Sequence, residues 1–254
     1  ALQSQYLTQG PTVDHFEKKV SQHVNSNYGI AVNSATSALH IACLALKLGP
    51  GNWLWTSPIT FVATANCAKY CGAKVDFIDI DPSTGLLSIE KIKQKLEIAE
   101  KLGRLPKIVI PVHLAGTSCE MKSLSKLAKY YGFSIIEDAS HAIGGKYNNE
   151  PVGNCKYSAI TIFSFHPVKI ITTGEGGLAT TNDYNLYLKM LQLRSHGITK
   201  NRDNFEYEPD GPWIYEQHDL GYNYRMTDIQ AALGISQLKR LEKIVDERNN
   251  ILCM

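Results

Sequence analysis

Residues 28–49 have the sequence YGIAVNSATSALHIACLALKLG, and this stretch holds one complete unit of the pattern that decides the fold. Residues 28–33 form a short apolar run of the kind found in buried strands. Residues 36–48 carry apolar side chains at helical spacing and are followed by Gly49, a common residue at helix ends. The stretch therefore predicts a strand, a turn rich in hydroxyl groups and a helix.

The same alternation of short apolar runs and amphipathic stretches continues along the chain. Further strands are predicted at residues 53–56, 75–80, 108–112, 134–137, 159–163 and 178–181. Further helices are predicted at residues 61–71, 88–102, 121–131 and 184–194. Strands that alternate with helices favour a parallel sheet covered by helices on its faces. We therefore expect an α/β domain with a mostly parallel seven-stranded sheet between helices.

Two segments near the end of the sequence depart from this alternation. Residues 198–217 mix polar and aromatic residues without periodicity, which predicts a long loop, and such loops are often functional or mobile. Residues 227–250 are predicted to form one long helix capped by Thr227. The sequence stops at Met254, within or just after that helix. We expect the chain to be truncated there.

Charge and composition exclude several classes of protein. The 254 residues contain 26 Lys and Arg against 24 Asp and Glu, and a formal charge of +2 provides no broad basic surface for nucleic acid. No stretch approaches the ~20 apolar residues of a membrane-spanning helix, and residues 1–5 lack the features of a signal peptide. We expect a soluble cytoplasmic protein that binds neither nucleic acid nor membranes.

The cysteines do not form a recognisable metal site or disulfide framework. No two of them have C-x-x-C spacing, and no histidine lies at a spacing that would complete a zinc site. We expect reduced thiols and no metal, with Cys67 and Cys71 on one helix face as small core residues. The six cysteines are Cys43, Cys67, Cys71, Cys119, Cys155 and Cys253.

Polar residues follow two of the predicted strands, at the sheet edge where open parallel sheets bind ligands. Ser34, Ala35 and Thr36 follow the strand at 28–33 and begin a helix, where free N–H groups and hydroxyls could hold a phosphate. Asp138 and His141 follow the strand at 134–137. Simple helix capping and a structural histidine remain alternatives for these residues.

A lysine follows a third strand. Residues 164–169, SFHPVK, come directly after the apolar run 159–163 and bring Ser164, His166 and Lys169 to the same edge. On its own, Lys169 is compatible with an ordinary surface lysine. An amine, a buried acid and a phosphate cradle together are the groups that pyridoxal phosphate requires. Phe61 could stack on the ring of that cofactor, although packing in the core is an equal alternative.

Ordered motifs across nearly the whole chain resemble those of the DegT/DnrJ/EryC1/StrS sugar-nucleotide aminotransferases, a family of fold-type I pyridoxal phosphate enzymes. They are LTQGP (7–11), NSATSAL (33–39), EDASHA (137–142), SFHPVK (164–169), GEGG (174–177), RSHG (194–197) and GYNYRMTDIQAA (221–232). Within the family, SPITFVATAN (57–66) and YEQHDLG (215–221) are most similar to the aminotransferases of pseudaminic acid synthesis.

The resemblance implies roles for the matching residues. Lys169 would hold the cofactor as a Schiff base and move protons, Asp138 would pair with its ring nitrogen, and Phe61 would stack on its ring. Ser34, Ala35, Thr36 and Ser164 would bind the phosphate, with His141 beside the ring. Asn223 would reach the phosphate of a neighbouring subunit, while Arg225 and His166 would lie on the substrate side. A purely structural role stays open for His166.

The resemblance also implies a substrate and an assembly. The expected reaction transfers an amino group, usually from glutamate, to C4 of a UDP-linked 4-keto-6-deoxy-N-acetylhexosamine. The expected assembly is a homodimer with shared active sites. We take residues 1–254 as the large cofactor-binding domain, with the small C-terminal domain of the family missing from the chain.

Four other functions are compatible with parts of the sequence. Another nucleotide-sugar aminotransferase, acting at C3 or on a different 4-keto sugar, stays open, as does a non-catalytic dimeric protein of this fold. A sugar dehydratase of the same family is disfavoured because those enzymes replace the lysine with histidine. A nicotinamide oxidoreductase is disfavoured because no strand leads into G-x-G-x-x-G, and residues 174–177 have the wrong spacing.

Overall fold

The computed structural model describes residues 2–252, and the seven predicted strands form one sheet in it. β9 runs antiparallel to both of its neighbours, and all other adjacent pairs are parallel. The predicted mostly parallel α/β sheet is confirmed. The strand order is β1 (Tyr28–Val32), β9 (Gly177–Thr181), β8 (Ile160–Ser164), β5 (Ser134–Asp138), β4 (Ile108–Ile110), β2 (Trp53–Thr56) and β3 (Lys74–Phe77).

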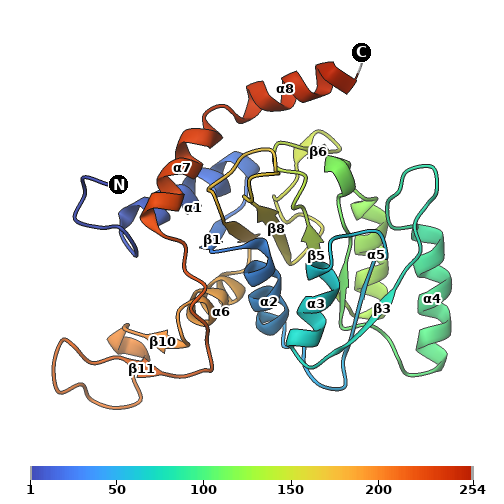
Figure 1. Cartoon of the computed structure of the whole chain (residues 1–254). Coiled ribbons are helices and arrows are strands. Elements are labelled where there is room, and N and C mark those ends of the chain that lie inside the picture. The colour runs from blue at the N-terminus through green and yellow to red at the C-terminus, as the bar shows by residue number, and fades with distance from the viewer. Residues whose placement is uncertain (1, 253–254) are drawn as a thin grey trace.

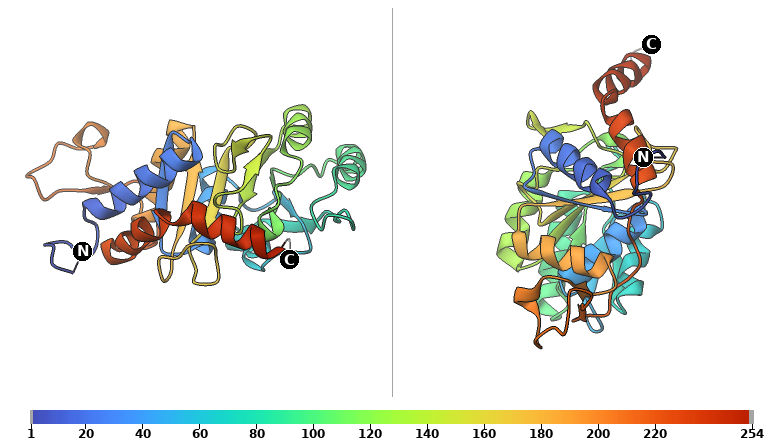
Figure 2. Two further views of the ribbon diagram at one scale, coloured as in Figure 1. Left: turned by 90° about the horizontal axis from the view of Figure 1, so that it is seen from above. Right: turned by 90° about the vertical axis from the view of Figure 1, so that its left-hand side faces the viewer.

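Helices cover both faces of this sheet (Figures 1 and 2). Ile30 and Val32 of β1 pack in one core cluster with α2 (Ala35–Ala45), α3 (Ala63–Tyr70) and α6 (Tyr184–Arg194). Ala31, between them, packs on the opposite face, as the two-residue period of a strand requires. That second face is covered by α1 (Pro11–Val24), α7 (Asp228–Leu238), α4 (Ile89–Lys101) and α5 (Met121–Tyr131).

Short elements complete the chain. The predicted loop at residues 198–217 contains two paired two-residue strands and extends from the body of the protein at the lower left of Figure 1. No helix within residues 2–252 is long and apolar enough to cross a membrane. The short elements are η1 (Leu114–Gly116), β6 (Lys146–Tyr147), β7 (Glu150–Pro151), β10 (Ile198–Thr199), η2 (Arg202–Asn204) and β11 (Glu216–Gln217).

The prediction of one helix over residues 227–250 is wrong. Thr227 does cap α7, with its hydroxyl accepting the Gln230 N–H, but α7 ends at Leu238 and a separate α8 (Leu241–Leu252) follows. The break turns Leu241 into the core, where it is 1% exposed. Leu241 and Val245 pack there over Gly144, which leaves no space for a side chain. The tertiary contact therefore overrides the continuous helical pattern.

A buried carboxylate joins the ends of β4 and β5. Glu137 is 5% exposed and accepts hydrogen bonds from Ser158 and Thr161 at 2.5 and 3.2 Å. His113 Nε2 lies 2.7 Å from its other oxygen, and His113 Nδ1 accepts the Cys119 N–H, so the ring proton faces Glu137. Burial raises the pKa of Glu137, but these donors outweigh burial, and the net pKa is lowered.

Replacing the Glu137 carboxylate should lower the stability of the domain. Glu137→Gln would offer one amide oxygen in place of two carboxylate oxygens, so it could not accept both from His113 and from the hydroxyls of Ser158 and Thr161. We expect a loss of about 2 kcal/mol in the free energy of unfolding. The exposed pair of Glu150 and Lys156 provides the control, because Glu150→Gln should cost under ~1 kcal/mol. Urea unfolding of both variants measures the difference, and equal losses would contradict the assigned role of the buried network.

Candidate active site

A cavity of about 470 Å³ opens at the carboxyl ends of β1, β4, β5 and β8. This is the edge at which open parallel sheets bind ligands. Nine predicted site residues from four separate parts of the sequence line it together. They are Ser34, Ala35, Thr36, Phe61, Asp138, His141, Ser164, His166 and Lys169.

The start of α2 forms one side of the cavity. Ser34 is the helix cap, and its side-chain oxygen accepts the Ser37 N–H at 3.1 Å. The Ser37 hydroxyl in turn donates to Asn33 at 2.6 Å. Gly177 of β9 packs so closely that a Cβ there would lie 2.4 Å from the Ala35 nitrogen. Capping therefore holds the helix start in place, while Ala35 and Thr36 still line the cavity and leave it suited to an anion.

Asp138 is held by a helix residue that the sequence did not single out. Thr64 of α3 is fully buried and donates its hydroxyl to Asp138 Oδ2 at 2.7 Å. The Ser140 N–H donates to Oδ1 at 3.1 Å. Since the only hydroxyl proton of Thr64 goes to Asp138, the contact of 2.9 Å between Thr60 and Thr64 must have Thr60 as donor. A chain of hydroxyls thus fixes the carboxylate.

Lys169 and His141 lie near this carboxylate. Burial lowers the pKa of Lys169, and the charge of Asp138 acts in the opposite direction. Burial also lowers the pKa of His141, and the Lys169 charge adds to that effect. The Ala115 N–H donates to His141 Nδ1 at 3.4 Å, so the neutral ring carries its proton on Nε2. The pair is an amine shifted toward its nucleophilic form beside a neutral imidazole.

Two predicted residues lie at the rim of the cavity. Phe61 is 72% exposed, so it is not a core residue and its ring is free to stack on a bound ligand. His166 is also exposed, and its Nε2 lies 3.7 Å from a Glu175 carboxylate oxygen. The Val168 N–H donates to His166 Nδ1. Phe61 therefore does not pack in the core of this chain. His166 has both a structural contact and a position at the cavity.

The structure does not bring Asn223 and Arg225 to this cavity. Asn223 is exposed and pairs with Ser195 in an isolated bridge. Arg225 lines a separate cavity of about 170 Å³ together with Arg194 and Asp14. Within one copy of the chain, neither residue lines the larger cavity.

The residues around the larger cavity fit pyridoxal phosphate. The helix start offers N–H groups and hydroxyls to a phosphate, and Asp138, 5% exposed, offers a carboxylate to a protonated ring nitrogen. Lys169 offers an amine with a lowered pKa to an aldehyde. Within residues 2–252, no group of three or more His, Cys, Asp or Glu is placed to hold a metal ion.

Similar proteins are sugar aminotransferases. The model of the DegT/DnrJ/EryC1/StrS aminotransferase family matches residues 1–254. The chain is 42% identical over 252 residues to UDP-4-amino-4,6-dideoxy-N-acetyl-beta-L-altrosamine transaminase of Campylobacter jejuni, covering 99% of this chain and 62% of that protein. The chain thus spans less than two thirds of the length of this relative.

Two solved structures show the same fold. PseC of Helicobacter pylori, an aminotransferase of pseudaminic acid biosynthesis, matches with a TM-score of 0.82 and 35% identity, over 95% of this chain and 61% of that one. NtdA of Bacillus subtilis, solved with the cofactor PMP bound, matches with a TM-score of 0.80 and 31% identity, over 95% of this chain and 51% of that one.

The hydroxyl of Thr64 should matter for cofactor binding as well as for packing. Thr64→Val keeps the shape of the side chain but leaves Asp138 Oδ2 without its donor, and we expect about tenfold weaker binding of pyridoxal phosphate. Thr64→Ser retains the hydroxyl and should bind almost as the unchanged protein does. Titrations followed by visible absorbance measure both dissociation constants, and equal values for the two variants would rule out this role.

Proposed function

The chain belongs to the DegT/DnrJ/EryC1/StrS aminotransferase family, and we propose that it is the cofactor-binding domain of a pyridoxal-phosphate-dependent aminotransferase acting on nucleotide sugars. The observation that carries the proposal is the meeting of Lys169, Asp138 and the start of α2 around one cavity. These groups come from different strand ends, and each supplies one feature that the cofactor needs.

Each residue has a defined task in this proposal. Ser34, Ala35, Thr36 and Ser164 bind the phosphate, and Asp138 keeps a proton on the ring nitrogen. Phe61 covers the ring, and the Nε2–H of His141 is a donor beside it. When bound, the cofactor supplies an electron sink for carbon acids.

Lys169 moves the proton. Lys169 lines the cavity as an amine whose pKa burial lowers, and an amine at that place can take a proton from carbon and return it to carbon. The charge of Asp138 opposes that lowering, which keeps the amine basic enough to accept a proton.

We propose that the amino acceptor is C4 of a UDP-linked 4-keto-6-deoxy-N-acetylhexosamine and that glutamate is the donor. The named activity of the Campylobacter relative, 42% identical to the chain, supports this sugar. Pseudaminic acid or a related amino sugar would be the pathway product. Another 4-keto sugar, or amination at C3, is the second candidate.

The proposed assembly is a homodimer in the cytoplasm. Free thiols at the five described cysteines favour a reducing compartment, while Cys253 lies outside the described residues. Exposed apolar side chains surround the cavity mouth, and Asn223 and Arg225 lie away from it. A second subunit would cover these exposed apolar side chains and bring its own Asn223 to the phosphate. The apolar rim consists of Ile59, Phe61, Val62 and Val168.

The first test is the reaction itself. With glutamate and candidate UDP-4-keto sugars, the purified protein should form a 4-amino sugar nucleotide, identified by mass and by proton couplings. Lys169→Arg should abolish the product and the visible absorbance of bound cofactor, because arginine stays protonated. Lys101→Arg, at an exposed helix position, is the matched control and should change neither. Product formation by Lys169→Arg would refute the proposal.

Mixing two inactive variants tests the shared site. Lys169→Arg and Asn223→Ala should each be inactive or weak alone, but a mixed dimer would keep one site with both residues intact. Random exchange of subunits should then restore about a quarter of the full activity. If Asn223 acts on its own subunit, both sites of the mixed dimer remain damaged and the mixture gains nothing.

A further inference from the structure

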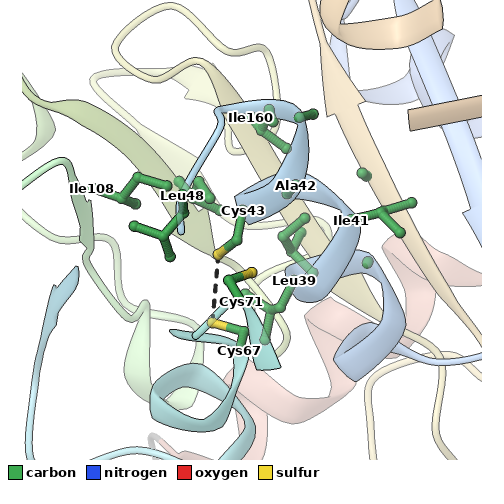
Figure 3. Close-up of a cluster of buried hydrophobic side chains, with 14 of the residues drawn as sticks. Leu39, Ile41, Ala42, Cys43, Leu48, Cys67, Cys71, Ile108 and Ile160 are labelled. Atoms are coloured by element: carbon green, nitrogen blue, oxygen red, sulfur yellow. Dashed lines mark hydrogen bonds between the residues drawn. The ribbon is translucent and has the colours of Figure 1, made fainter. Parts of the chain in front are cut away.

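Three thiols meet where α2 packs on α3, at the ends of these helices that point away from the cavity. Cys43 comes from α2, Cys67 from α3, and Cys71 from the residue that ends α3 (Figure 3). Cys43 Sγ lies 3.6 Å from Cys67 Sγ and also interacts with Cys71. Within residues 2–252 the cluster does not qualify as a metal site. The arrangement therefore calls for thiol chemistry rather than metal binding.

A histidine with an unused nitrogen lies beside this cluster. His40 is one turn before Cys43 on α2 and is 5% exposed. Its Nδ1 lies 3.1 Å from the Tyr224 hydroxyl, whereas its Nε2 is buried and has no hydrogen-bond partner among the described residues. His40 also acts on Cys71 electrostatically. A buried ring nitrogen without a partner is costly, and the neighbouring thiol is a source of the missing proton.

The three sulfurs differ in acidity and in access. A hydrogen bond from Cys43 lowers the pKa of Cys71 to about 6 against the effect of burial, and His40 adds to the lowering. Hydrogen bonds to Cys67 and Cys71 raise the pKa of Cys43 instead. Cys71 is 8% exposed and follows the exposed Tyr70, whereas Cys43 and Cys67 are fully buried. At neutral pH the outermost sulfur is thus the thiolate, and its neighbour keeps a proton.

We propose that Cys71 and Cys43 form a peroxide-reactive thiol pair, in which Cys71 is oxidised first and Cys43 then closes a disulfide between α3 and α2. The Cys71 sulfur attacks one peroxide oxygen, the O–O bond breaks, and a sulfenic acid and hydroxide result. The Cys43 sulfur then attacks the Cys71 sulfur, the S–O bond breaks, and water leaves with the Cys43 proton. In sum, two thiols are oxidised and one hydrogen peroxide becomes two waters.

The position of Cys67 explains why it is a bystander rather than the attacking thiol. Its S–H donates to the Thr64 carbonyl one turn earlier on the same helix. It lies deeper than Cys71 and shares the helix with it, so only Cys43 faces Cys71 from the opposite helix. The proposed bond would join the helix whose start lines the cavity to the helix that carries Thr64.

The test uses the purified native protein, hydrogen peroxide and a cyclic diketone that traps sulfenic acids, followed by peptide mass mapping. We expect a Cys43–Cys71 disulfide in the unchanged protein and a trapped sulfenic acid at Cys71 in Cys43→Ser. Cys71→Ser should leave Cys43 and Cys67 reduced, and Cys67→Ser, the control within the cluster, should still form the disulfide. Cys155, whose pKa burial raises to about 11, should stay reduced throughout.

A second measurement needs no variant and does not depend on transamination. In the native protein at neutral pH, iodoacetamide should alkylate Cys71 at least tenfold faster than Cys119 or Cys155, since reactivity follows the thiolate fraction and access. Similar rates for the three cysteines, or a Cys43–Cys67 disulfide that forms at an unchanged rate in Cys71→Ser, would overturn the proposal.

Discussion

The alternation of side chains along β5 is the constraint on which the candidate site depends. Glu137 and Asp138 are neighbours in sequence, and the strand directs their carboxylates to opposite faces of the sheet. Glu137 is bound by His113, Ser158 and Thr161 behind the cavity, while Asp138 lines the cavity itself. Backbone bonds complete the support, because the His113 N–H donates to the Asp138 carbonyl. The acid that would face a cofactor is therefore held from behind by a buried network.

Strands and strand ends could be predicted from the sequence because they depend on local patterns and on one general rule. Apolar runs bounded by turn residues located β2, β5 and β8, and the rule that parallel strands end at one edge brought Ser34, Asp138 and Lys169 together. β9 could not be assigned a direction in this way. β9 pairs antiparallel with β1 and β8. This direction depends on the path of the chain between β8 and β9, and the local sequence pattern of a strand does not indicate that path.

The remaining details depend on contacts between distant segments. Thr64 sits in an ordinary helical pattern, and nothing near it in sequence indicates that its hydroxyl reaches Asp138, 74 residues away. The break between α7 and α8 follows from the packing of Leu241 over Gly144 rather than from a helix-breaking residue. Arg225 lies in a motif next to Asn223, yet both lie outside the cavity of their own chain. For such residues a sequence motif can suggest a function, but only the folded structure shows where the side chain lies.

The cysteines also come together through contacts between distant segments, at one end of the helix pair α2 and α3. Their spacing correctly predicted buried thiols, but Cys43 and Cys67 come together only because α2 packs on α3. At the ends facing the cavity, the same two helices present Thr36 and Thr64. α3 is only 8 residues long, about 12 Å. Thr64 lies one turn from Cys67 and two turns from Cys71, so one short helix carries both the buried thiols and the residue that donates to Asp138.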